Sequence, residues 1–97
     1  MITAANLKEL YNKDLMTFLD VREVDEVKSA PFEGLDVTHI PMKNVPQEFQ
    51  KLNKEKHIIV ACRSGGRSQM ICDFLEDEGF ESVSNLQGGI IAWSQLG

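Results

Sequence analysis

The sequence predicts an α/β fold built around a mostly parallel β-sheet. Short apolar segments rich in β-branched residues alternate along the chain with segments that contain helix-forming residues and apolar residues three or four positions apart. Strands that alternate with helices are typical of parallel sheets. A chain of 97 residues has room for one domain, which we expect to span residues 1–97 without linkers or internal repeats.

The first half of the chain contains a predicted helix and two predicted strands. Thr3 is a suitable cap for a helix that extends to about Asn12. Residues 16–21 form an apolar strand with polar residues only at its borders, and residues 36–40 form a second short strand. Residues 23–28, which are highly charged, form at most a short helix between these strands.

The second half repeats this alternation around a central strand. Pro46 is placed to open a helix as its first residue. Residues 57–61 read as a buried strand, and the helix predicted at 69–78 ends before a glycine. Residues 82–86 form the last strand, and residues 89–96 form the closing helix.

The composition excludes several classes of function. A net charge of −5 and a pI near 4.9 disfavour non-specific binding to nucleic acid and to anionic membranes. No apolar run approaches the roughly 20 residues needed to span a bilayer, and residues 1–7 do not resemble a secretory signal. Two cysteines do not form a disulfide scaffold, so we expect a reducing compartment, the cytoplasm.

The loop that starts with Cys62 lies between a predicted strand and a predicted helix. The pKa of a cysteine thiol falls near a helix N-terminus and near arginine, and successive backbone amides can form a concave anion site. Gly65 and Gly66 suit a loop with positive φ angles, and Arg63 and Arg67 add positive charge. These residues predict a loop that holds a negatively charged atom on or beside the sulfur. The alternative is a plain strand-to-helix turn with a buried thiol.

This loop resembles the active-site loop of rhodanese-like sulfurtransferases, in the sequence Cys62-Arg63-Ser64-Gly65-Gly66-Arg67-Ser68. Residues 20–23 resemble the family's D-V-R-E segment, and residues 79–80, 85–90 and 92–93 resemble its C-terminal signature. The matches follow in the right order over nearly the whole chain. The resemblance implies a small rhodanese fold with a five-stranded sheet and helices on both faces. The G-H-I-P-G-A-like turn of many members is missing from residues 29–36, so we expect a different local shape there.

Cys62 is the predicted catalytic nucleophile. It would take the outer sulfur of thiosulfate or a persulfide, hold it as a persulfide, and pass it to a thiol or cyanide. No cofactor is expected, and no metal-ligand spacing is present. The expected partners are a small sulfur donor and a thiol acceptor, with a sulfur-accepting protein as a further candidate. The predicted substrate-binding loop comprises Arg63, Ser64, Gly65, Gly66, Arg67 and Ser68.

Individual loop residues have expected roles and alternatives. Arg63 is the expected contact for an anionic donor, and Arg67 is expected to stabilise charge and shape the loop. The alternative for either arginine is an exposed side chain paired with a nearby glutamate. Ser68 would contribute a hydroxyl to the site or, equally, cap the following helix. Cys72 is expected to be packed and inert, with a resolving thiol as the alternative.

Asp20 and Arg22 are expected to support the site without taking part in the chemistry. The resemblance places them beside the active loop, where Asp20 would orient Arg63 or the loop amides. The alternative is a buried ion pair that holds two loops together. Glu23 is a further candidate partner for Arg22.

Two other functions remain open from the sequence. Cysteine phosphatases and arsenate reductases resemble this arrangement, but phosphatases place five residues between Cys and Arg, whereas residues 63–66 are four. A persulfide carrier that serves a partner protein fits the same residues as a free-standing enzyme. The sulfurtransferase interpretation requires that the amides of residues 63–68 converge on the Cys62 sulfur and that solvent reaches this sulfur.

Overall fold

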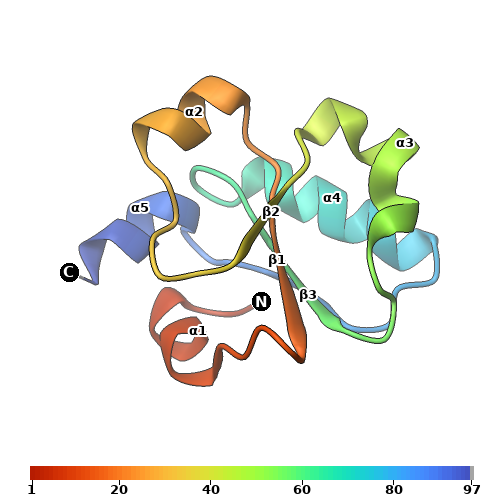
Figure 1. The fold of residues 1–97 in the computed structure, drawn as a ribbon, viewed down its shortest axis with the longest axis horizontal. Coiled ribbons are helices and arrows are strands. Elements are labelled where there is room, and N and C mark those ends of the chain that lie inside the picture. Colours follow the sequence, from red (N-terminus) through yellow and green to blue (C-terminus); the bar gives the residue numbers. More distant parts are fainter. Residues whose placement is uncertain (97) are drawn as a thin grey trace.

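The centre of the molecule is a sheet of four parallel strands in the order β2-β1-β3-β4 (Figure 1). The structure, a computed structural model, describes residues 1–96. It confirms the predicted parallel α/β class. The strands are β1 (Met16–Asp20), β2 (Val37–His39), β3 (His57–Ala61) and β4 (Val83–Asn85).

The expectation of a five-stranded sheet is wrong, because the sheet within residues 1–96 has four strands. Ile2 forms a single parallel bridge with Leu86 at the edge of the sheet. Thr3 then accepts a hydrogen bond from the Asn6 N–H at 3.1 Å and caps helix α1, as the sequence predicts. Because the chain turns into a helix directly after Ile2, no further residue can pair with β4.

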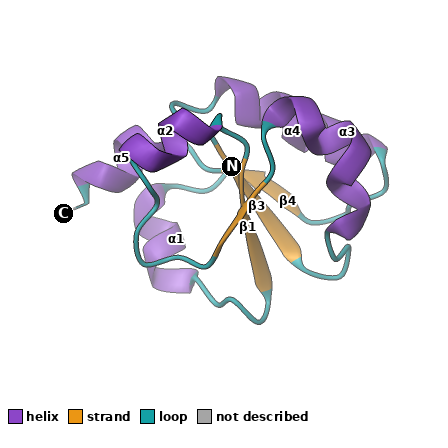
Figure 2. Cartoon of the chain, turned by 45° about the horizontal axis from the view of Figure 1, so that its top comes forward, coloured by secondary structure: helices purple, strands orange, loops and turns teal. Residues whose placement is uncertain are grey.

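Helices cover both faces of the sheet, as the resemblance implies (Figure 2). The helices α1 and α5 pack on one face, and α3 and α4 pack on the other. The α-helices are α1 (Ala4–Leu10), α2 (Val24–Ser29), α3 (Val45–Glu48), α4 (Gly66–Asp77) and α5 (Gly89–Gln95), with short 3₁₀ turns η1 (Met42–Asn44) and η2 (Phe49–Lys51).

The two central strands are buried on both faces. In β1, Leu19 packs with Leu75 of α4, whereas the adjacent Phe18 packs with Leu7 of α1 on the opposite side. This two-sided burial explains why β1 and β3 are apolar along most of their length. Since all strands are parallel, their carboxyl ends share one edge of the sheet, where β1 ends at Asp20 and β3 ends before Cys62.

Two predicted helix starts are displaced. The helix α4 begins at Gly66 and not at residue 69, because Gly65 adopts φ +119° as its N-cap and the loop leads directly into the helix. Only Gly65 of the loop's two glycines has a positive φ, so this expectation is wrong for Gly66. The helix α3 begins at Val45, which makes Pro46 its second residue.

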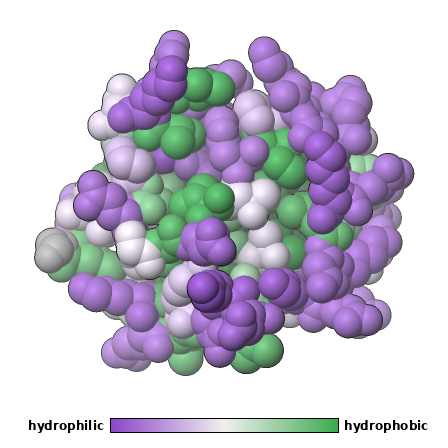
Figure 3. Space-filling model, in the orientation of Figure 1, coloured by the Kyte–Doolittle hydropathy of each residue, from purple (hydrophilic) through white to green (hydrophobic). Residues whose placement is uncertain are grey.

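Polar side chains predominate on the face seen in Figure 3, with smaller apolar areas between them. Within residues 1–96, no helix combines the length and the apolar character that crossing a membrane requires.

Candidate active site

The Cys62 sulfur lies at the N-terminus of α4, under the loop that leads into this helix. Its Sγ atom accepts a hydrogen bond from the Gly65 N–H at 3.1 Å. Gly65 adopts a left-handed conformation as the N-cap of α4, so the loop passes directly into the helix beside the sulfur. A helix N-terminus favours negative charge, so the loop is built to stabilise an anionic sulfur.

Burial raises the pKa of the Cys62 thiol, but hydrogen bonding has the larger combined effect and holds this pKa below its usual value. The lowering comes from the Ser68 side chain and from the backbone amides of Ser68, Gly65 and Ser64. Of the amides of residues 63–68, that of Gly65 is the one whose N–H forms a hydrogen bond of full geometry with the sulfur, so the predicted convergence is present only in part.

Cys72 has the opposite environment. It is packed in the apolar cluster between the sheet and α4, with 3% of its surface exposed. Burial, together with the carboxylates of Glu76 and Asp73, raises the pKa of its thiol to about 12. Cys72 is thus a packed neutral thiol, whereas Cys62 is the cysteine whose surroundings favour the thiolate.

Ser68 belongs to the site and does not cap α4. The N-cap is Gly65, and Ser68 lies inside the first turn, so the capping alternative is wrong. The Ser68 Oγ atom is 3.3 Å from Cys62 Sγ. The same hydroxyl is in hydrogen-bond contact with the Asn85 side chain, which projects from the end of β4.

The two loop arginines have different surroundings. Both terminal nitrogens of Arg67 donate to the Glu26 carboxylate at 2.7 Å. The bond from Arg67 is the largest reason why the pKa of Glu26 falls to about 2, and the same pair raises the pKa of Arg67. Arg63 is exposed and makes no side-chain hydrogen bond or ion pair within residues 1–96. Arg67 is therefore the arginine that pairs with a glutamate, as the alternative interpretation expects. The guanidinium of Arg63 is unpaired within residues 1–96.

Asp20 and Arg22 form a buried ion pair, with 0% and 1% of their surfaces exposed. Arg22 Nη2 donates to Asp20 Oδ2 at 2.8 Å, and Arg22 Nε lies 3.0 Å from Oδ1. The Asp20 carboxylate makes no hydrogen bond with Arg63 or the loop amides within residues 1–96, so that expectation is wrong, as is the pairing of Arg22 with Glu23. Arg22 Nη1 donates to the Glu26 carbonyl at 3.3 Å. Because Glu26 also binds Arg67, the pair is linked to the active loop through α2.

The N-terminus of α5 forms hydrogen bonds with the backbone at the start of the loop 62–68. The Ile90 N–H donates to the Cys62 carbonyl at 3.0 Å, and the Ile91 N–H donates to the Arg63 carbonyl at 3.4 Å. Gly89 has φ +51°, and a Cβ atom there would lie 2.3 Å from the Cys62 carbonyl oxygen. This contact explains the glycine at position 89, because only a residue without a side chain allows so close an approach.

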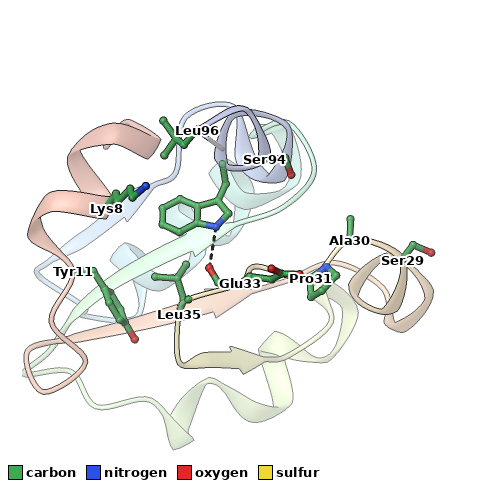
Figure 4. A pocket seen from close by; sticks show the side chains of 11 residues that line it. Lys8, Tyr11, Ser29, Ala30, Pro31, Glu33, Leu35, Ser94 and Leu96 are labelled. Carbon is green, nitrogen blue, oxygen red and sulfur yellow. Dashed lines mark hydrogen bonds between the residues drawn. The ribbon is translucent and has the colours of Figure 1, made fainter.

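Two hollows lie on the same side of the domain. A shallow one of about 300 Å³ lies between α2 and α5, and it borders the active loop at Arg63 and α5 at Ile90. A second, of about 550 Å³, lies further along α5, where Trp93 Nε1 donates to the Glu33 carbonyl (Figure 4). No residue of the loop 62–68 lines the second hollow.

The two histidines lie outside the loop. His39 Nε2 is 2.6 Å from the Arg22 carbonyl oxygen, and His57 Nε2 is 2.8 Å from Ser84 Oγ. Burial lowers the pKa of His57. These contacts give both side chains a structural role.

Comparison with known proteins identifies the family. Residues 3–96 match the model of the Rhodanese-like domain. The chain belongs to this family.

The similarity of this rhodanese-like domain to individual proteins extends over nearly its whole length. It is 40% identical to "Putative sulfurtransferase YtwF" of Bacillus subtilis, over 95% of this chain and 87% of that protein. It is 31% identical to a protein named "Sulfurtransferase" of Allochromatium vinosum, over 93% of this chain and 82% of that one. The crystal structure of a rhodanese-related protein from Thermoplasma volcanium superimposes with a TM-score of 0.86, at 31% identity, over 99% of this chain and 91% of that chain.

Sequence reasoning on this rhodanese-like domain missed two residues of the site, Glu26 and Asn85. Asn85 stands in the segment that resembles the family's C-terminal signature, so a signal for it was present. Glu26 is one of several acidic residues in a charged stretch, and nothing in the sequence distinguishes it from its neighbours.

The expected access of solvent to the sulfur is wrong for this conformation, because Cys62 is only 1% exposed. Its neighbours Ser64 and Gly66 are exposed, and Gly65 is partly exposed. The Cys62 side chain is therefore covered in this structure, and binding of a donor at the sulfur requires this cover to open.

Proposed function

We propose that this rhodanese-like domain is a sulfurtransferase that carries a sulfane sulfur on Cys62 as a persulfide. The observation that carries the proposal is the hydrogen bond from the Gly65 N–H, at the N-cap of α4, to Cys62 Sγ. Amides aimed at a sulfur stabilise the thiolate before transfer and the terminal persulfide sulfur afterwards. The two relatives named as sulfurtransferases support sulfur transfer as the general activity.

The proposed reaction has two steps. In the first, the Cys62 thiolate attacks the outer sulfur of a donor such as thiosulfate, the S–S bond of the donor breaks, and sulfite leaves with the bonding electron pair. In the second, an acceptor thiolate or cyanide attacks the outer sulfur of the Cys62 persulfide. The product is the acceptor persulfide or thiocyanate, and the Cys62 thiolate is regenerated. Because the sulfur is bound covalently between the steps, ping-pong kinetics are expected.

We assign donor binding to Arg63 and loop support to Arg67. The Arg63 guanidinium borders the hollow of about 300 Å³ and has no carboxylate partner within residues 1–96, so it is free to bind an anion. Arg67 is held by Glu26 through two hydrogen bonds, which leaves those two nitrogens unavailable to a substrate. The same pairing disfavours a phosphatase, because the arginine of a phosphate loop must reach the phosphate oxygens.

Replacing Arg63 with alanine is expected to raise the KM for thiosulfate about tenfold or more, because a hydrogen bond to a charged group contributes roughly 1.5–3 kcal/mol. Steady-state kinetics with thiosulfate, which carries two negative charges, and with a persulfide donor that carries one measure this effect. The singly charged donor should show a smaller change. Lys13→Ala removes the same charge just before β1, at the opposite edge of the sheet, and should leave both KM values unchanged. Equal losses with both donors would contradict the assignment of Arg63.

The main test is incubation with thiosulfate followed by measurement of the intact mass. We expect one added sulfur per chain, abolished in Cys62→Ser and retained in Cys72→Ser, since Cys72 is a buried neutral thiol. Sulfur uptake that survives in Cys62→Ser would overturn the proposal. Release of phosphate from an aryl phosphate without sulfur uptake would favour the phosphatase.

The second half of the test distinguishes enzyme from carrier. An enzyme transfers the bound sulfur to cyanide or a small thiol with multiple turnovers, whereas a carrier loads one sulfur and releases it only to a partner protein. Persulfide formation without turnover would therefore replace the enzyme with the carrier. We also propose a cytoplasmic location, because chemistry at a free thiol suits a reducing compartment.

A further inference from the structure

Asn85, on β4, is connected to the reactive sulfur through one residue, because its side chain contacts Ser68 and Ser68 contacts Cys62 Sγ. It is 6% exposed, at the carboxyl end of the strand. Its Oδ1 atom accepts a hydrogen bond from the Ser68 hydroxyl at 2.5 Å. Its Nδ2 atom donates to the Gly65 carbonyl at 3.0 Å and to Gln69 Oε1 at 3.2 Å. The opposite orientation of the amide would place two oxygens against each other at Gly65, so these contacts fix which atom faces Ser68.

The Ser68 hydroxyl has one proton and three acceptors within reach. The acceptors are Asn85 Oδ1 at 2.5 Å, the Gly65 carbonyl at 3.2 Å and Cys62 Sγ at 3.3 Å. The shortest contact is to Asn85, so the proton points to Asn85 in the resting protein. A lone pair of Ser68 Oγ then faces the sulfur and can accept the S–H of the neutral thiol.

Ionisation of Cys62 changes this arrangement. A thiolate has no proton to donate, and the Ser68 Oγ lone pair facing it is repulsive, so the hydroxyl must turn its proton to the sulfur. That movement leaves Asn85 Oδ1 without its donor in a buried position, which carries a desolvation cost. Asn85 and the thiolate therefore compete for a single proton.

We propose that Asn85 is a positioning residue that holds the Ser68 proton away from the sulfur and so favours the neutral thiol of Cys62 in the resting protein. The loop amides and the Ser68 hydroxyl, once it turns from Asn85, then stabilise the thiolate, and Asn85 limits how far the thiolate is favoured.

The functional value of keeping the Cys62 pKa from falling too low rests on the proposed function, sulfur transfer. In thiol–disulfide exchange a thiolate of lower pKa leaves faster but attacks more weakly, and the best attacking thiol has a pKa near the ambient pH. Cys62 has to attack in the first step and leave in the second. A residue that keeps its pKa from falling too low would balance the two steps.

The other groups around the sulfur are the same in all the variants proposed below. On α4 these are the Arg67 guanidinium, paired with Glu26, and the Cys72 thiol. On the neighbouring strand β1, the Asp20–Arg22 pair lies beyond Ala61. The end of α5 contributes a backbone amide to the Cys62 carbonyl.

The test is the pH dependence of Cys62 alkylation by iodoacetamide, followed by intact mass and peptide mapping. Asn85→Leu, which is close in volume and has no acceptor, is expected to lower the pKa of Cys62 by about one unit, because the freed hydroxyl can donate to the thiolate. Well below this pKa, the thiolate fraction rises about tenfold. Asn85→Ala should shift the pKa of Cys62 in the same direction. It serves as the test if Asn85→Leu does not fold, and circular dichroism shows whether each variant is folded.

Two further variants separate this role from a merely structural one. Ser68→Ala should raise the pKa of Cys62, and Asn85→Leu should cause no further fall in the Ser68→Ala background, because the effect passes through that hydroxyl. Gln69→Leu removes another partner of Asn85 but leaves the contact with Ser68, and it should leave the pKa of Cys62 unchanged.

A raised or unchanged pKa in Asn85→Leu would overturn the proposal, because a mere loss of loop support raises the pKa. An equal fall with and without the Ser68 hydroxyl would also overturn it. The measurement uses no sulfur donor, so it stands even if the domain takes up no sulfur.

Discussion

Replacing Asp20 with alanine is expected to destabilise the domain by about 3–5 kcal/mol, a large share of the roughly 5–15 kcal/mol that holds a small domain folded. The Asp20 carboxylate is fully buried and accepts hydrogen bonds from the backbone and the guanidinium of Arg22. Without it, Arg22 is left as a buried charge with no partner carboxylate. The Arg22 guanidinium also lies 4.8 Å from the Phe32 ring centre, a contact too weak to replace a counter-charge.

Urea unfolding of the wild type and the variant measures this loss. Asp36→Ala is the matched control, since Asp36 is exposed and its carboxylate makes no ion pair within residues 1–96, and it should change stability by less than about 0.5 kcal/mol. Asp20→Ala combined with Arg22→Met removes both charges and should recover much of the stability. A loss below about 1 kcal/mol for Asp20→Ala alone would show that solvent reaches Arg22.

The fold could be predicted where burial determines the sequence directly. The strands β1 and β3 are covered on both faces, so their residues are apolar in succession and the segments stand out. The start of α4 could not be located in this way, because its N-cap is Gly65, which has no side-chain cap to serve as a signal. The fifth strand was an expectation from the family and not from the residues, which indicate four. The cap at Thr3 explains why the chain leaves the sheet so early.

The site could be predicted where it is formed by one continuous segment. The loop from Cys62 to Ser68 is local, so its residue types indicated an anion-stabilising cysteine without any tertiary information. The partners of that loop come from elsewhere in the chain. Glu26 lies on α2, and Asn85 lies on β4. Their contacts exist because the carboxyl ends of the strands meet at one edge of the sheet, and spacing along the sequence does not encode which polar side chain arrives there.

Gly89→Ala is expected to reduce the rate of sulfur uptake at least about 100-fold, through steric displacement of the active loop. A Cβ atom at this position would lie 2.3 Å from the Cys62 carbonyl oxygen and 2.5 Å from the Arg63 carbonyl oxygen. Backbone atoms cannot move aside as a flexible side chain does, so the loop or α5 has to shift. The Ile90 amide that holds the Cys62 carbonyl at 3.0 Å would move with it. A misplacement of about 1 Å in a catalytic arrangement can cost about 100-fold in rate.

The measurement is the rate of sulfur uptake from thiosulfate by intact mass, with urea unfolding to show how much of the variant is folded. Gly34→Ala is the matched control, because Gly34 has φ +82° but a Cβ atom there would meet nothing within 4 Å. Both variants place alanine in a left-handed conformation, which costs about 1–2 kcal/mol of stability. Only Gly89→Ala adds a collision with the loop backbone. If the folded fractions of both variants took up sulfur at the same rate, the tight contact of α5 would have no part in shaping the site, and the glycine would serve backbone conformation alone.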